Sequence, residues 1–97
     1  MSIRPIILYA FHASGCVVCE QEMPRVTAWA TGRVAQFAFV PVNVSFNQWR
    51  PRGLEKVGRV TPTFALVRGE DVLGMHEGAF EEEKRFEKFA KSALEGV

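Results

Sequence analysis

The sequence has few of the features that mark a metal-binding, membrane or nucleic-acid-binding protein. Only two of its 97 residues are cysteine, and neither a second cysteine pair nor a paired histidine motif accompanies them. Tetrahedral zinc needs four ligands, so a zinc site would have to recruit His12 and His76 as isolated ligands, and we expect no metal. The formal net charge of +1 gives no reason to expect nucleic acid or an anionic membrane as a partner.

Long apolar runs are also missing. Near the N-terminus the longest is residues 6–11, which is too short for the core of a signal peptide or for a membrane span. We therefore expect a cytoplasmic protein, in a compartment where most thiols are reduced and a closely spaced cysteine pair is usually catalytic. The chain has no repeat, low-complexity stretch or linker, and we expect a single domain over residues 1–97 and a monomer.

The two cysteines lie where an expected strand gives way to an expected helix. Residues 6–11 are apolar on both alternating faces, which is typical of a central strand, and Ser14 or Gly15 can cap a helix that begins near Cys16. In the first turn of a helix, Cys16 and Cys19 share one face, close enough for their sulfurs to bond. The helix dipole and the free N–H groups there favour the nucleophilic thiolate. We interpret the pair as redox-active rather than as half of a zinc site or as two inert buried thiols.

Hydrophobic periodicity predicts the remaining elements. The first helix ends at Thr31-Gly32 and has an inward stripe of Cys19, Met23, Val26 and Ala30. Strands are expected at residues 37–44, 63–68 and 72–76, with a tight turn between the last two, and a short helix at residues 54–57. The final helix begins with Glu81, Glu82 and Glu83 and has an inward stripe of Phe86, Phe89, Ala90, Ala93, Leu94 and Val97.

This order predicts an α/β fold, a four-stranded mixed sheet in the sequence β-α-β-α-β-β-α with helices on both faces. The first two strands are joined through a helix and should be parallel, whereas the last two should form an antiparallel hairpin. Pro41 cannot donate to a strand ladder, so we expect its strand to lie at an edge of the sheet or to contain a bulge.

Taken in order, these residues resemble the thioredoxin fold family. In that family the redox motif follows a central strand, and a proline stands five residues after the second cysteine, as Pro24 does here. A second family motif, a residue followed by a cis-proline and Thr, matches Thr61-Pro62-Thr63 at the start of the hairpin. Glycines in the hairpin turn and before the last helix match as well. The resemblance spans residues 6–94 and is nearer to the minimal, glutaredoxin-like form, because no extra strand and helix precede the central strand.

The resemblance implies a thiol–disulfide oxidoreductase. Cys16 would attack a substrate disulfide, and Cys19 would resolve the mixed disulfide, so that no organic cofactor or metal is implied. The implied partners are a disulfide-containing protein and an electron-donating reductase or glutathione. Thr61 would pair its backbone with an extended substrate segment, the strand-addition mode of recognition. The expected substrate-binding set is Thr61, Pro62, Gly15 and Val17.

Two departures from the family bear on the mechanism. The buried acid of thioredoxins corresponds to Ala10, so the usual acceptor for the Cys19 proton is absent, and His12 or Glu20 could substitute through water. Val17 and its neighbour Val18 offer no side-chain donor to a thiolate, which favours a reducing rather than an oxidising pair.

Two other functions remain open at this point. A glutathione-dependent, glutaredoxin-like enzyme fits the short architecture but lacks the usual Pro-Tyr between the cysteines. A non-catalytic module could use the Thr61-Pro62 groove to hold a partner. Residues 46–52 alternate aromatic and arginine side chains, but one short cluster at near-zero net charge is insufficient for nucleic-acid binding. We expect Trp49 to pack down and the arginines beside it to be solvated.

Overall fold

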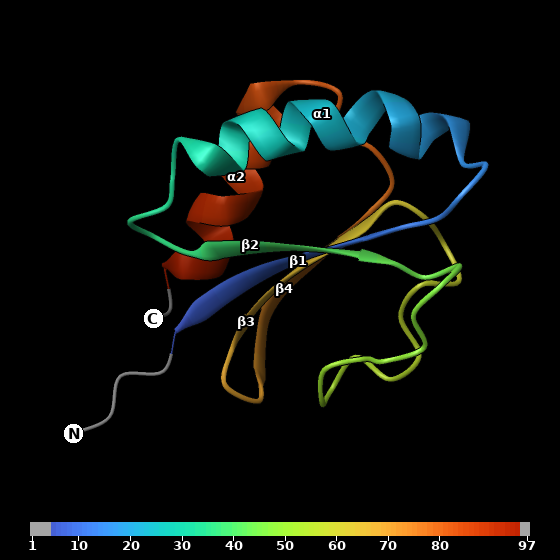
Figure 1. The fold of residues 1–97 in the computed structure, drawn as a ribbon. Helices are drawn as coiled ribbons and strands as arrows, with labels where there is room; N and C mark the ends of the chain where they lie inside the picture. Colours follow the sequence, from blue (N-terminus) through green and yellow to red (C-terminus); the bar gives the residue numbers. More distant parts are fainter. Residues whose placement is uncertain (1–4, 96–97) are drawn as a thin grey trace.

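The computed structural model describes residues 5–95, which form one four-stranded sheet and two helices (Figure 1). The elements in chain order are β1 (Ile6–His12), α1 (Val17–Thr31), β2 (Ala38–Asn43), β3 (Thr63–Arg68), β4 (Asp71–Glu77) and α2 (Glu83–Leu94). The strand order is β2-β1-β3-β4, with β2 parallel to β1 and β3 antiparallel to both β1 and β4. The predicted α/β fold with a four-stranded mixed sheet and all four predicted strands are confirmed, whereas the prediction of helices on both faces is wrong, since both described helices pack on one face.

The central position of β1 is also confirmed. Its residues Leu8, Tyr9, Ala10 and Phe11 are all buried, alternately toward one face of the sheet and the other. On one side β1 pairs with β2, where Ala10 lies opposite Pro41. β2 is an edge strand with a neighbour on one side only, which is where a proline is tolerated in a sheet.

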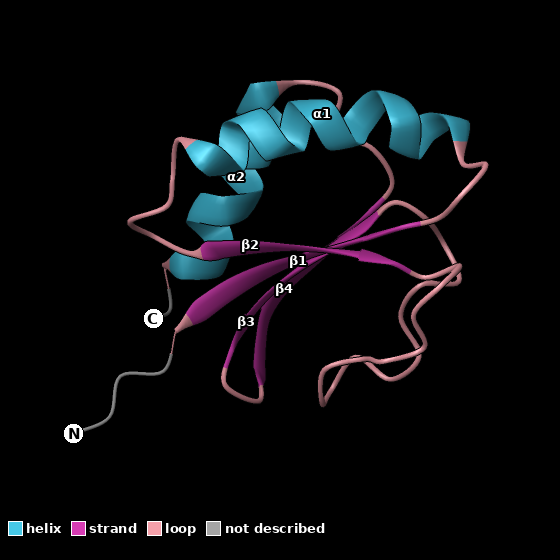
Figure 2. Cartoon of the chain, in the orientation of Figure 1, coloured by secondary structure: helices cyan, strands magenta, loops and turns pink. Residues whose placement is uncertain are grey.

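Both helices cover the same face of the sheet (Figure 2). Phe86 and Ala90 of α2 and Val26 of α1 are buried in one cluster with β1 and β3, as their helical spacing predicts. The last predicted member of the α2 stripe, Val97, lies outside the described residues. Within residues 5–95, no helix combines the length and the apolar character that crossing a membrane would require.

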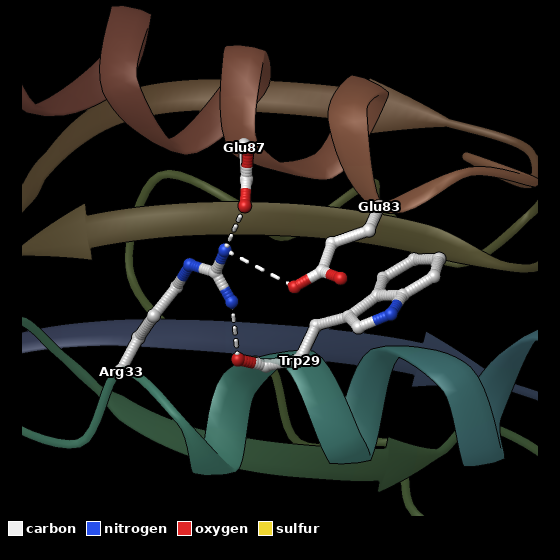
Figure 3. Close-up of polar contacts among 4 residues, drawn as sticks. All are labelled: Trp29, Arg33, Glu83 and Glu87. Carbon is white, nitrogen blue, oxygen red and sulfur yellow. Dashed lines mark hydrogen bonds and ion pairs between the residues drawn. The ribbon is translucent and has the colours of Figure 1, made fainter.

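An arginine two residues after the end of α1, Arg33, links the two helices (Figure 3). The Nη2 atom of Arg33 lies 2.7 Å from a carboxylate oxygen of Glu87 and 3.4 Å from one of Glu83, both on α2. Its Nη1 donates to the carbonyl of Trp29 at 2.6 Å, and the guanidinium lies over the ring of Phe86. The ion pairs therefore extend the apolar contact between α1 and α2 toward the surface.

The opposite face differs from the prediction. Residues 54–57 form turns instead of the predicted short helix, so the second face is covered by the irregular segment 44–62. Gly53 and Gly58 flank these four residues with φ of 92° and 109°, left-handed conformations that end a helix. Leu54, the first of these residues, is nevertheless fully buried, in one cluster with Tyr9 and Phe11.

Arg50 holds this segment in place, which corrects the prediction that it is solvated. Its Nε donates to the carbonyl of Val57 at 2.7 Å, and its Nη1 donates to the carbonyls of Asn47 and Trp49 at 2.9 and 2.8 Å. Its guanidinium lies 5.5 Å from the ring centroid of Phe11. Trp49 contacts the ring of Tyr9 yet stays 53% exposed, so it packs down only in part.

Candidate active site

Three segments that are distant in the sequence meet at one end of the sheet, where β1 and β4 end and β3 begins. In the strand register, Phe11 near the end of β1 pairs with Thr63 at the start of β3, and Thr63 pairs with Glu77 at the end of β4. The residues just beyond these ends are therefore neighbours. They are the loop that leads into α1, the residues before β3, and Gly78 after β4.

The loop that leads into α1 is fixed by short polar contacts. The backbone N–H of Ser14 donates to Oγ of Ser45 at 3.0 Å, and Nδ2 of Asn43 donates to Oγ of Ser14 at 3.3 Å. Gly15 follows with a φ of 78°, a backbone conformation that residues other than glycine adopt only with strain. Nothing lies within 4 Å of where a Cβ would stand, so the glycine is required by the backbone conformation and not by lack of space.

Cys16 and Cys19 form a disulfide with their Cα atoms 5.2 Å apart. Cys16 is itself the N-cap of α1, in place of the predicted Ser14 or Gly15, and its Sγ accepts the backbone N–H of Cys19 at 3.1 Å. An N–H aimed at a sulfur at the positive end of a helix favours the thiolate of Cys16 once the bond is reduced. Cys16 is half-buried and Cys19 is 2% exposed, so an incoming molecule can reach only the first sulfur.

The Thr61–Pro62 pair lies against this sulfur. The carbonyl oxygen of Thr61 is 3.7 Å from Cys16 Sγ, and the peptide bond between Thr61 and Pro62 is cis. Pro62 is buried, and its carbonyl accepts the N–H of Gly78 at 2.7 Å. The structure thus brings together the cysteines and Thr61-Pro62, two parts of the expected site that lie more than 40 residues apart in the chain.

Exposed valines stand next to the cysteines and to Thr61 in the chain. Val17, between the cysteines, is 65% exposed, and Val18 and Val60 are exposed as well. Exposed valines beside a reactive sulfur give an apolar docking surface rather than a charged one. Gly15 and Val17, both predicted to bind substrate, lie at its rim by virtue of flanking Cys16.

Neither predicted proton acceptor contacts the cysteines. His12 is half-buried at the end of β1, where burial lowers the pKa of its imidazole, and Glu20 is exposed on α1. No hydrogen bond among the described residues joins either side chain to Cys16 or Cys19. Ala10, at the position of the family's acid, is fully buried and has no ionisable group.

The sequence analysis missed one buried acid. Glu22 on α1 is 1% exposed, and its Oε1 has no hydrogen-bond partner among the described residues. The signal was present, because Glu22 lies three residues after Cys19 and four before Val26, on the inward stripe of the helix. Between residues 5 and 95, His, Cys, Asp and Glu form no group of three that could hold a metal ion.

Comparisons with solved structures identify this arrangement. A thioredoxin f2 of Chlamydomonas reinhardtii matches with a TM-score of 0.75 over 97% of this chain and 83% of its own, at 19% identity. The chain has the thioredoxin fold. A thioredoxin of Fasciola hepatica gives 0.73 over 92% of this chain and 81% of its own, at 21% identity. The germline-specific thioredoxin Deadhead of Drosophila melanogaster gives 0.68 over 88% and 77%, at 24% identity.

At the level of sequence the chain stands apart from these structures. No family model matches it, and no curated protein matches it either. The identities of 19–24% therefore show the thioredoxin-like fold alone. What the site does has to be argued from its own residues.

Proposed function

We propose that this protein is a thiol–disulfide oxidoreductase that reduces protein disulfides through Cys16 and Cys19. One observation carries the proposal: a cysteine pair at the N-terminus of a helix, with the first sulfur half-buried against the Thr61 backbone and the second covered. Half a zinc site would not need a closed disulfide, and two inert thiols would not leave one sulfur accessible beside an apolar surface.

The chemistry proceeds in two steps. The thiolate of reduced Cys16, favoured by the Cys19 N–H and by the helix N-terminus, attacks one sulfur of a substrate disulfide and releases the other as a thiolate. The thiol of Cys19 then loses its proton, and its sulfur attacks Cys16, which closes the Cys16–Cys19 bond and releases the second substrate thiolate. The dithiol loses two electrons and the substrate gains two.

The surroundings support a protein substrate. An extended segment with an apolar side chain beside its cysteine fits the exposed Val17, Val18 and Val60, while the Thr61 backbone offers a place for main-chain pairing. Val17 and Val18 carry no side-chain donor that would stabilise a thiolate further, which favours a reductant over an oxidant. A reductase or glutathione would supply electrons, and the cytoplasm is the compartment that suits a reducing pair.

Insulin reduction tests the proposal. We expect the wild-type protein to accelerate disulfide reduction when dithiothreitol or a thioredoxin reductase supplies electrons, and Cys16→Ser to abolish it. Cys19→Ser should instead accumulate a mixed disulfide at Cys16, visible as a mass increase that dithiothreitol reverses. A Cys16→Ser variant as active as the wild type would contradict the proposal. Replacing the reductase by glutathione as the electron donor distinguishes a glutaredoxin-like enzyme, and unchanged partner capture by an inactive wild-type protein would indicate a binding module.

A further inference from the structure

A buried carboxylate lies one helical turn beyond the second cysteine. Glu22 is almost completely buried, and its Oε1 has no partner among the described residues. Its other oxygen, Oε2, accepts the backbone N–H of Glu81 at 3.1 Å, which fixes the position of the carboxylate. Folded proteins rarely leave a buried polar atom unpaired, so such an atom is a reason to look for a chemical role.

The helix places Glu22 beside Cys19. Both are buried and three residues apart on α1, so they share the inward face, where Cβ atoms at this spacing are about 5–6 Å apart. Long side chains on a helix also point back toward its N-terminus, over the preceding turn. For Glu22 that turn contains Cys19.

Residues 78–81, which include the hydrogen-bond partner of Glu22, also contact the segment of Thr61 and Pro62. Glu81 lies three residues after Gly78, whose N–H bonds the carbonyl of Pro62. Pro62 follows Thr61, whose carbonyl faces Cys16 Sγ. Glu22 is therefore connected to the site in two ways: it lies one turn from Cys19 on the buried face of α1, and residues 78–81 join its carboxylate to the segment of Thr61 and Pro62.

The second chemical step needs an acceptor for the proton of Cys19. A covered thiol must lose its proton before its sulfur can attack, and water has little access to Cys19. Ala10 has no ionisable group, Glu20 is exposed and His12 lies at the end of β1, whereas Glu22 is buried on the same face of α1 as Cys19. A carboxylate oxygen without another partner is suited to take a proton directly or through one water.

We propose that Glu22 accepts the proton of Cys19 when the mixed disulfide is resolved. The inference rests on the proposed function, since it concerns a step of that reaction. The Cys19 S–H proton moves to the Glu22 carboxylate, the sulfur–sulfur bond between Cys16 and Cys19 forms, and the bond between Cys16 and the substrate sulfur breaks. The substrate leaves as a thiolate that is protonated by solvent, and Glu22 returns its proton when the pair is reduced again.

The charged neighbours of Glu22 leave it free for this role. Arg25, Glu81 and Glu82 line a surface cleft of about 500 Å³ together with Glu22. Arg25 donates from its Nη1 to the carbonyl of Glu81 at 3.4 Å rather than to the Glu22 carboxylate. Glu81 and Glu82 are exposed, whereas Glu22 is buried.

The test compares Glu22→Gln with Glu70→Gln, an exposed glutamate in the turn between β3 and β4 that pairs with Arg52. The glutamine keeps the size of Glu22 and an oxygen for the Glu81 N–H, but it cannot take a proton. Reduced protein is mixed with 5,5′-dithiobis(2-nitrobenzoate) in a stopped-flow instrument. The first release of thionitrobenzoate reports attack by Cys16, and the second reports resolution by Cys19.

We expect Glu22→Gln to slow the second release about 100-fold at pH 7, the low end of the range for a positioned proton acceptor, with the first release unchanged. The deficit should shrink as the pH rises past about 8.5, the ordinary pKa of a thiol, because hydroxide can then remove the proton. Glu70→Gln should match the wild type in both phases. Glu22→Ala, which opens space at the carboxylate, should regain resolution when formate is added.

Three results would overturn the inference. The second release of Glu22→Gln could equal that of the wild type, or it could be slower by the same factor at every pH, which indicates a structural role alone. If Glu22→Gln does not fold, Glu22→Ala decides, and the absence of rescue by formate in that variant counts against the proposal. A wild-type protein that shows neither phase and reduces no insulin would remove the proposed function itself, and this inference with it.

Discussion

The two faces of the sheet are covered by different means. On one face, α1 and α2 pack regular apolar stripes against β1 and β3 (Figure 1). On the other face, residues 44–62 contain no helix or strand and are held by Arg50 through its bonds to backbone carbonyls. The candidate site joins the two, because its cysteines begin α1 whereas Thr61 and Pro62 end the irregular segment. The reacting sulfurs thus belong to the start of a helix. The Thr61 backbone, which we expect to bind the substrate, belongs to the irregular segment.

The helical face should be the more sensitive to loss of a single side chain. Phe86 is fully buried and its ring contacts those of Trp29, Phe37 and Phe80. We expect Phe86→Ala to lower the free energy of unfolding by about 3–5 kcal/mol, as measured by urea denaturation. Phe46→Ala, at an exposed phenylalanine of the irregular segment, should change it by less than about 0.5 kcal/mol. Equal effects would mean that the core is not where this account places it.

The stability of the irregular segment should depend on the hydrogen bonds of the Arg50 guanidinium rather than on its positive charge. Arg50→Lys keeps the charge but loses the fork that reaches three carbonyls, and we expect a loss of about 2 kcal/mol in unfolding free energy. Hydrogen exchange should speed up in residues 47–58 and stay unchanged in α1. Arg52→Lys is the control, since Arg52 is exposed and pairs only with Glu70 across the surface, so its effect should be near zero. Uniform loss of protection over the whole chain would contradict a local role.

A close approach between α2 and β4 gives a smaller effect on the helical side. A Cβ added at Gly74 would lie 2.9 Å from the Cβ of Ala93, so Gly74→Ala should destabilise the protein by about 1–3 kcal/mol. Gly32→Ala is the matched control, because Gly32 has helical φ and its nearest neighbour stands at 3.6 Å. There the substitution should be neutral or stabilising by up to about 1 kcal/mol. Thermal unfolding measures both, and a Gly74→Ala protein as stable as the wild type would show that α2 can move away from the sheet.

The smallest expected effect concerns His12, at the junction between the faces. Burial lowers the pKa of its imidazole below the usual 6.5, so protonation disfavours the folded state. Its contribution to stability is therefore greatest above pH 6.5 and falls as the pH drops through the lowered pKa. His12→Asn should lose less stability than the wild type between pH 7 and pH 5 in urea titrations. If the unfolding free energy of the wild type instead rose relative to that of His12→Asn as the pH falls, the result would contradict a pKa lowered by burial.

The regular half of the molecule could be predicted from the sequence because periodicity reports burial. The alternation-free residues 6–11 predicted the central strand, and the spacing of Phe86 and Ala90 predicted the inward face of α2. Pro41 predicted that its strand lies at an edge or contains a bulge, and β2 is an edge strand. The short helix predicted at residues 54–57 does not form, and the burial of Leu54 was not predicted.

The irregular half and one part of the site could not be predicted in the same way. Nothing in the spacing of Arg50 shows that its side chain turns inward to bond backbone carbonyls, because those acceptors exist only once the loop has folded. Glu22 has the opposite problem. It lies on the inward stripe, but glutamate is almost never buried unpaired, so residue type argued against its position. Such conflicts between pattern and residue type are expected at functional sites.

The reduction potential of the Cys16–Cys19 pair tests the central claim most directly. Equilibration of the protein with redox buffers of reduced and oxidised dithiothreitol or glutathione, followed by quantification of the two forms, gives the value. A reversible pair nearer to about −270 mV, as in a strong reductant, is the predicted result, because Val17 and Val18 add no side-chain donor to the thiolate. A value near −120 mV, as in a strong oxidant, or a disulfide that neither buffer opens, would contradict the account.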